Sequence, residues 1–215
     1  MNILVLGATG GSGHAVSDAL IGRGHRVTAV ARHATALPPR PGLERVDGDA
    51  TDAAFLDRVV PGHDAVVVTL GISEPTIRVR LRGAQGTPGD VRSRGTAAVV
   101  AAARRAGIRR VVVQSSYGVG ETRALLGLVD RIFLALLVKP QIADSEIQEG
   151  VLRGSGLDWT IVQPVHLSDD ESDDHFVSTD GRTRQHKVSR RAVAQVHADL
   201  VEQGGMIRQT VSVSG

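Results

Sequence analysis

The sequence contains no cysteine. Disulfide bonds, a thiolate nucleophile and cysteine-ligated metal sites are therefore excluded. Lysine is nearly absent as well, because Lys139 and Lys187 are the only two and arginine supplies almost all of the positive charge. The formal net charge is only +2. So small an excess gives little support for nucleic-acid binding, and we expect no nucleic-acid partner.

Long hydrophobic runs are also missing. The longest apolar segment, residues 124–138, is interrupted by Asp130 and Arg131 and is too short to cross a bilayer. Packing or self-association is the simpler role for this segment, so we expect a monomer or a homodimer. The first seven residues lack the basic region and cleavage site of a signal peptide and predict a first strand instead. We therefore expect a cytoplasmic protein with no membrane partner.

Short β-branched runs alternate with longer helical patterns along the 215 residues. The runs cover residues 3–6, 26–30, 43–46, 65–69, 110–114, 159–162 and 210–213. This alternation predicts βαβ units, and apolar runs of this kind suit parallel strands buried on both faces. We predict one α/β domain over residues 1–215, with a Rossmann-like, doubly wound, mostly parallel sheet.

Three insertions interrupt this rhythm, at residues 72–89, 118–140 and 166–186. Each follows a predicted strand, so we expect them to gather at the carboxyl edge of the sheet and shape a substrate pocket. The first contains Arg78, Arg80 and Arg82, which attract an anionic substrate or, as we favour, form a solvated edge. The third is acidic but matches no metal-ligand spacing, so we predict no metal site. Its candidate ligands are Asp169, Asp170, Asp173, Asp174 and His175.

A glycine-rich turn stands between the first predicted strand and the first predicted helix. Its sequence is Gly7-Ala8-Thr9-Gly10-Gly11-Ser12-Gly13. The first glycine permits a tight turn, the second lets the backbone approach a pyrophosphate, and the third packs helix against strand. The free N–H groups of the helix start then bind phosphate. We predict a dinucleotide site with contacts from Gly7, Thr9, Gly10, Gly11, Ser12 and Gly13.

The residue after the second predicted strand indicates which dinucleotide binds. NAD-selective sites place Asp or Glu there to bind the ribose hydroxyls, but this chain has Arg32. A guanidinium matches a 2′-phosphate, so we predict NADP(H); a surface arginine is the alternative. Asp49, as an adenine acceptor, and Ala50 follow the third strand, and Asp52 suits a helix N-cap. Leu70 and Gly71 follow the fourth strand and complete this part of the predicted site.

Several segments together resemble the atypical short-chain dehydrogenase/reductases. They are residues 7–13, Arg32, residues 48–52, 68–71, 115–118, 149–164 and 211–213. The resemblance covers nearly the whole chain and is to the NAD(P)H-binding, NmrA-like branch that includes small flavin and biliverdin reductases. It implies that Ser115 and Ser116 lie beside the nicotinamide ribose. It also implies that Pro164, Val165 and His166 form the wall of the nicotinamide pocket.

The chain departs from this family at three positions. A lysine often stands four residues before the glutamate equivalent to Glu149, but here that residue is Ser145. The arginine usual before Pro164 is Gln163, and Tyr117 lacks a lysine four residues later. A tyrosine needs such a cation to lower its pKa of about 10. We therefore treat Tyr117 as a doubtful catalyst and name Ser116, Tyr117 and His166 as the candidate catalytic residues.

These observations predict an NADP(H)-dependent oxidoreductase that reduces a small, planar, conjugated acceptor of the flavin, quinone or bilin type. Such an enzyme can hold donor and acceptor in contact and take its proton from solvent. The alternative is a non-catalytic NADP(H)-binding sensor or regulator. An epimerase or dehydratase is disfavoured by the missing Tyr–Lys pair.

Overall fold

An eight-stranded sheet runs through the centre of the computed structural model, which describes residues 1–71, 87–127 and 139–215. The strand order is β3-β2-β1-β4-β5-β6-β10-β8, and every neighbouring pair is parallel except β10 and β8. The strands are β1 (Asn2–Leu6), β2 (Arg26–Ala31), β3 (Leu43–Asp47), β4 (Ala65–Val68), β5 (Arg110–Gln114), β6 (Asp158–Pro164), β8 (Phe176–Ser178) and β10 (Gln209–Ser214). The predicted doubly wound sheet is confirmed. The order reverses between β1 and β4, where open α/β sheets form a crevice.

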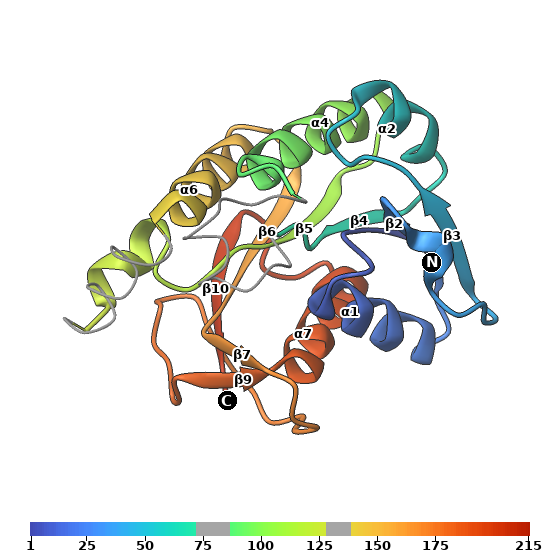
Figure 1. Cartoon of the computed structure of the whole chain (residues 1–215). Coiled ribbons are helices and arrows are strands. Elements are labelled where there is room, and N and C mark those ends of the chain that lie inside the picture. Colours follow the sequence, from blue (N-terminus) through green and yellow to red (C-terminus); the bar gives the residue numbers. More distant parts are fainter. Residues whose placement is uncertain (72–86, 128–138) are drawn as a thin grey trace.

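Helices cover both faces of this sheet (Figure 1). On one face α1 (Gly11–Gly22) packs against α7 (Arg190–Gln203). On the other face lie α2 (Ala53–Val59), α4 (Val91–Ala106) and α6 (Lys139–Arg153). Two short 3-10 helices, η1 (Ala34–Ala36) and η2 (Gly120–Leu125), lie in connections. The strands β7 (His166–Ser168) and β9 (Lys187–Ser189) form a separate parallel pair.

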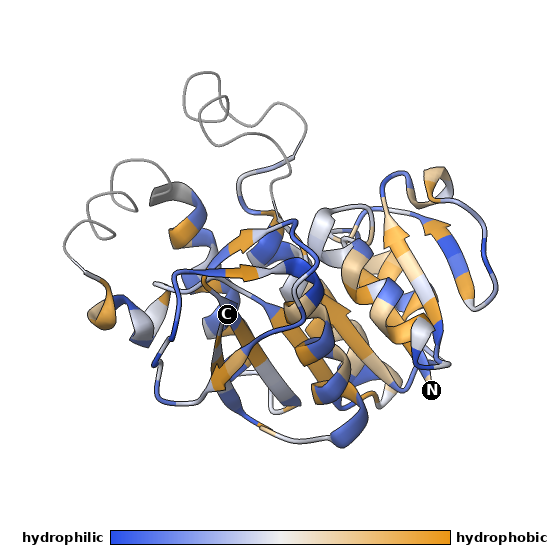
Figure 2. Cartoon of the chain, turned by 90° about the horizontal axis from the view of Figure 1, so that it is seen from below, coloured by the Kyte–Doolittle hydropathy of each residue, from blue (hydrophilic) through white to orange (hydrophobic). Residues whose placement is uncertain are grey.

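The hydrophobic core has two halves, one on each side of the sheet. Side chains of successive strand residues point to opposite faces, so Ile3 and Val5 join one half whereas Leu4 and Leu6 join the other. All four are fully buried. Figure 2 shows the apolar strands enclosed between helices whose outer surfaces are hydrophilic. The near-continuous apolar runs therefore arise because both faces of the sheet are covered.

The predicted helix boundaries agree with the structure at several ends. The Asp52 carboxylate accepts hydrogen bonds from the N–H groups of Ala54 (2.9 Å) and Phe55 (3.2 Å), which confirms the predicted cap of α2. Gly107 and Gly204 end α4 and α7 with positive φ values of 73° and 61°. The helix α4 begins at Val91, after a turn closed on the carbonyl of Pro88.

The acidic insertion at residues 166–186 is more ordered than a solvated loop. It contains β7 and β8, and β8 forms the antiparallel edge of the main sheet. Its carboxylates pair with cations that follow it: Asp169 with Arg190, Asp170 with Lys187 at 3.3 Å, and Asp173 with Arg191 at 2.6 Å. These ion pairs join the insertion to β9 and to the start of α7.

The other two insertions lie partly outside the described residues, which exclude 72–86 and 128–138. Arg78, Arg80 and Arg82 and most of the apolar segment 124–138 fall in those gaps. Leu125, which is described, is 55% exposed at the end of η2. Within the described ranges no helix is both long and apolar enough to cross a membrane. Those same ranges hold no cluster of three or more histidine or acidic residues arranged to bind a metal ion.

Candidate functional site

Two adjoining cavities open at the carboxyl edge of the sheet. One, of about 500 Å³, is lined by the glycine-rich turn, Arg32, the segment after β3 and the end of β4; we call it the glycine cleft. The other, of about 680 Å³, is lined by residues 114–117, 125–127 and 164–167, and we call it the serine pocket. Both are lined by the same five residues, Leu70, Arg92, Gln114, Leu167 and Arg190. This shared wall makes the two cavities one continuous site.

The glycine cleft depends on close backbone contacts that exclude larger residues. Gly7 has a φ of +82°, and a Cβ atom there would lie 2.8 Å from the carbonyl oxygen of Thr69. A Cβ atom on Gly13 would lie 2.2 Å from the carbonyl oxygen of Gly7. The N–H of Gly10 donates to that same oxygen at 3.0 Å. Gly7 and Gly13 thus bring β1, the turn and α1 together, as the sequence pattern predicts.

The N-terminus of α1 faces this cleft without any side-chain cap. Gly10 provides no capping side chain, and no acidic residue lies in the first turn. Gln114 Nε2 donates to Ser12 Oγ at 3.0 Å, which ties the end of β5 to the helix start. Thr9 and Gly11 are exposed in the cleft. First-turn N–H groups and the helix dipole make this end suitable for an anion.

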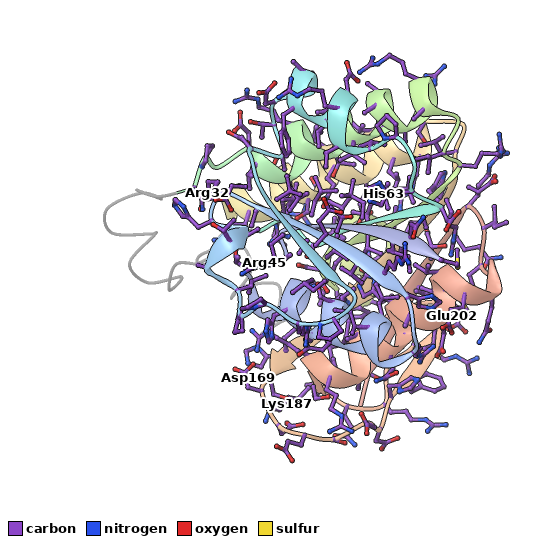
Figure 3. The ribbon with its side chains drawn as sticks, turned by 90° about the vertical axis from the view of Figure 1, so that its right-hand side faces the viewer. Arg32, Arg45, His63, Asp169, Lys187 and Glu202 are labelled. Carbon is purple, nitrogen blue, oxygen red and sulfur yellow. The ribbon has the colours of Figure 1, made fainter. Side chains whose placement is uncertain are left out.

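Arg32 stands at the β2 end of the glycine cleft, on the side of the molecule that also carries Asp169 (Figure 3). Its Nη2 donates to Thr87 Oγ1 at 3.0 Å. The nearby Asp49 carboxylate accepts from the N–H (2.8 Å) and hydroxyl (2.9 Å) of Thr51. The backbone hydrogen bond from Thr51 and the nearby arginines hold the pKa of Asp49 below its usual value. Ala50, which is buried, and Gly71 complete the lining.

The candidate catalytic residues differ in how their side chains are engaged. The Tyr117 hydroxyl donates to the carbonyl of Gly181 at 2.9 Å. The Ser115 hydroxyl donates to Glu149 Oε1 at 2.6 Å, away from solvent. Ser116 and His166 line the serine pocket, and their side chains form no hydrogen bond within the described chain. They are therefore the candidates best placed to contact a ligand.

The backbone of the predicted nicotinamide wall is fixed by main-chain hydrogen bonds. The carbonyl of Pro164 accepts from the N–H of Tyr117 at 3.0 Å, and the N–H of Val165 donates to Val213 at 3.0 Å. The N–H of His166 donates to His186 at 3.2 Å. Pro164, Val165 and His166 all line the serine pocket together with Ser115, as the family resemblance implies.

A buried polar network supports this wall from behind. Glu149 is 1% exposed, and its Oε1 accepts from both Ser115 and Gln163 Nε2 (2.7 Å). Arg153 lies 3.1 Å from Oε2 and forms an ion pair there, although the angle is too poor for a hydrogen bond. Thr122 donates to Gln163 Oε1 at 2.8 Å. The network locks the ends of β5 and β6 against α6.

The sequence did not single out Arg92, Gln114 or Arg190, three polar residues of the shared wall. A Cβ atom on Gly11 would lie 2.9 Å from Arg190 Nε, so this arginine covers the start of α1. Gln114 Oε1 is buried without a partner in the described chain. Arg92 Nη1 donates at 2.9 Å to Ser145, the residue at the position of the family lysine. The predicted strands indicated the edge of the sheet at which the site lies. The positions of these three residues in the sequence did not indicate that they would meet there.

Comparisons with known proteins agree with this geometry. The profile of a family described as NAD(P)H-binding matches residues 7–204. A 3-diazoavenalumate denitrifying reductase from a Streptomyces species is 40% identical over 116 residues, which are 54% of this chain. The aligned part spans only 38% of that reductase, so this chain covers well under two thirds of its length.

Solved structures show the same fold over the full chain. A short-chain dehydrogenase/reductase from Veillonella parvula DSM 2008 in complex with NADP has a TM-score of 0.81 and 20% identity, and covers 100% of this chain and 94% of its own. The anaerobillin reductase ChuY from Escherichia coli O157:H7 has a TM-score of 0.78 and 23% identity. The match covers 100% of this chain and 97% of ChuY. At these identities the likeness is one of fold.

Proposed function

Because this chain belongs to the NAD(P)H-binding family of atypical short-chain dehydrogenase/reductases, we propose that it is an NADPH-dependent reductase of a small, planar, conjugated acceptor. The observation that carries the proposal is the shared wall between the glycine cleft and the serine pocket. A dinucleotide with its phosphates at α1 would extend along this wall, and the wall residues would then hold its reactive end at the second cavity. The Streptomyces relative is named as a reductase, which supports the reaction class.

The residues of the glycine cleft suit NADP(H). Gly7, Gly10, Gly11 and Gly13 keep the turn compact, and the first turn of α1 has neither a side-chain cap nor an acidic residue. Arg32, braced by Thr87, supplies a cation where a 2′-phosphate is recognised. Asp49 accepts from Thr51 of its own loop through Oδ1 alone, which leaves Oδ2 for the adenine amino group.

The serine pocket suits a flat, partly apolar acceptor. Leu70, Pro164, Val165 and Leu167 give it apolar walls beside the polar side chains of Ser116 and His166. When bound, the reduced nicotinamide supplies a hydride. The wall residues hold the acceptor against it and exclude water, which lowers the barrier by positioning.

Reduction also needs one proton, and few side chains here are free to give it. The hydroxyls of Ser115 and Tyr117 donate to Glu149 and Gly181. We therefore assign the proton to solvent or to the exposed His166 at the pocket. The same engaged hydroxyls favour the alternative of a non-catalytic NADP(H)-binding sensor.

The test is the oxidation of NADPH, followed by its absorbance, with a panel of FMN, riboflavin, menadione and biliverdin. We expect turnover with at least one acceptor, and Ser116→Ala should slow it less than a change that closes the pocket, such as Ser116→Trp. Tight NADPH binding without turnover across the panel would establish the sensor instead. Absence of NADPH binding would refute both.

A further inference from the structure

The serine pocket is lined by two arginines, Arg92 and Arg190, and none of its described lining residues is a carboxylate. Arg190 forms an ion pair with Asp169, so its charge is balanced within the chain. Arg92 forms no such pair with any carboxylate in the described chain, and it lines both cavities.

The Arg92 side chain is held in place by its own helix and by α6. Its backbone N–H donates to Asp144 Oδ2 at 3.0 Å, and its Nη1 donates to Ser145 Oγ at 2.9 Å. Its Nη2 lies beside the end of β4, 3.2 Å from where a Cβ atom of Gly71 would be. The guanidinium is thus anchored at one nitrogen at the boundary of the glycine cleft and the serine pocket.

The Asp144 carboxylate accepts no hydrogen bond from the guanidinium of Arg92. Its Oδ1 accepts from the N–H of Ser93 (3.1 Å) and from the Ser93 hydroxyl, and its Oδ2 accepts from the backbone of Arg92. Asp144 therefore caps the start of α4. Apart from Nη1, the guanidinium nitrogens of Arg92 form no hydrogen bond within the described chain.

Arg92 is half-buried, and this partial loss of hydration makes its positive charge costly to leave without an anion. Loss of hydration lowers the pKa of its guanidinium, and the nearby Asp144 charge partly offsets this effect. Arginine nevertheless stays protonated in proteins. A desolvated cation with unused N–H groups gains most from a ligand oxyanion, which its planar fork can bind through two hydrogen bonds.

We propose that the acceptor carries an oxyanion group, a carboxylate or a phosphate, and that Arg92 binds this group at the shared wall. This inference rests on the proposed function and adds the charge of the substrate to it. Arg92 thereby sets specificity and fixes the acceptor at the boundary of the two cavities.

The test uses acceptor pairs that differ only or mainly in charge: biliverdin with its dimethyl ester, and FMN with riboflavin. Their dissociation constants are measured by isothermal titration calorimetry on the full chain with saturating NADP⁺, at low salt. We expect the charged member of one pair to bind at least about tenfold more tightly. Arg92→Gln should weaken that binding about 10- to 100-fold and leave the binding of the neutral member unchanged.

Arg94→Gln is the matched control, because Arg94 lies on the same helix, is 58% exposed and lines neither cavity. It should leave all dissociation constants unchanged. A preference for biliverdin over its ester identifies a carboxylate, and a preference for FMN over riboflavin identifies a phosphate. Equal binding of both members of each pair, no binding of any, or an equal loss of both members in Arg92→Gln would overturn the inference.

The two proposals fail separately. Turnover of neutral acceptors without charge preference supports the reductase and overturns the role of Arg92. Charge-dependent binding that Arg92→Gln abolishes, with no NADPH oxidation, supports the oxyanion site and overturns the reductase.

Discussion

At the scale of single residues, Arg32 and Arg26 mark the two ends of one strand. Arg26 begins β2 at the amino edge of the sheet, and Arg32 follows β2 at the carboxyl edge, where its Nη2 lies 3.0 Å from Thr87 Oγ1. Figure 3 shows that Arg32 lies on the opposite side of the molecule from His63 and Glu202. Replacing either arginine with glutamate changes the net charge equally. A comparison of the two variants therefore separates a local effect in the glycine cleft from an effect of net charge.

Arg32→Glu should weaken NADPH binding by about 2 kcal/mol or more, about 30-fold, because a charge-assisted contact with the 2′-phosphate is replaced by repulsion. NADH binding should change far less, so the preference between the two narrows. Fluorescence titration of both nucleotides measures this. Arg26→Glu serves as the control and should alter neither affinity. An unchanged preference in Arg32→Glu would show that Arg32 does not recognise the phosphate.

Contacts between residues that lie far apart in the sequence were the hardest features to predict. Arg92 and Ser145 are separated by 53 positions, and Ser115 and Glu149 by 34. Neither pair has a local spacing that indicates contact. The glycine-rich turn and the cap at Asp52 were predictable because both depend on neighbours within one or two turns of chain.

At the scale of elements, the sequence predicts the long strands but not the short ones. The six strands β1 to β6 have four to seven residues each, long enough for the sequence pattern to locate them. By contrast β7, β8 and β9 have three residues each, too few to show a period of two. In the structure β8 pairs with β10 and β7 pairs with β9, and neither partner is the next strand along the chain.

The end of α7 is held by a side chain from another element, Arg110 of β5. Its guanidinium donates to the carbonyl of Leu200 from Nε (3.1 Å) and Nη2 (2.7 Å), and also to that of Gly205 (3.1 Å). Carbonyl groups at a helix C-terminus lack partners within the helix. Arg110 thus binds α7 to the sheet through its last turn.

Arg110→Met should lower the free energy of unfolding by about 2–4 kcal/mol, because the buried carbonyl of Leu200 and the carbonyl of Gly205 lose a charged donor. Urea unfolding measures the change. Arg109→Met is the matched control: the adjacent arginine is exposed and pairs at the surface with Asp158, so its loss should change little. Similar losses in both variants would contradict the assigned role of Arg110.

At the scale of the whole molecule, a histidine links stability to pH. His197 of α7 is fully buried, and neither ring nitrogen has a hydrogen-bond partner in the described chain. Burial lowers its pKa from 6.5 to about 3. The folded protein therefore keeps the ring neutral in a pH range where the unfolded chain takes up a proton.

This difference stabilises the fold fully above about pH 6.5, and the stabilisation is lost as the pH falls toward 3. The loss should approach about 1.4 kcal/mol per pH unit in that window. His197→Leu should flatten the pH dependence of unfolding there, measured with urea at several pH values. His175→Leu, a change in an exposed loop, should leave the slope as in the wild type. Parallel curves for His197→Leu and the wild type would show that His197 is not the source.

The shared wall has a consequence for how this protein can diverge. Arg32 lines the glycine cleft but not the serine pocket, whereas Ser116 and His166 line the pocket but not the cleft. Substitutions at pocket residues outside the shared wall, such as Ser116 and His166, can therefore change which acceptor binds without changing which nucleotide binds. Among the described lining residues, only the five wall residues couple the two choices. The design of a reductase for a new acceptor would vary these pocket residues and leave the five wall residues unchanged.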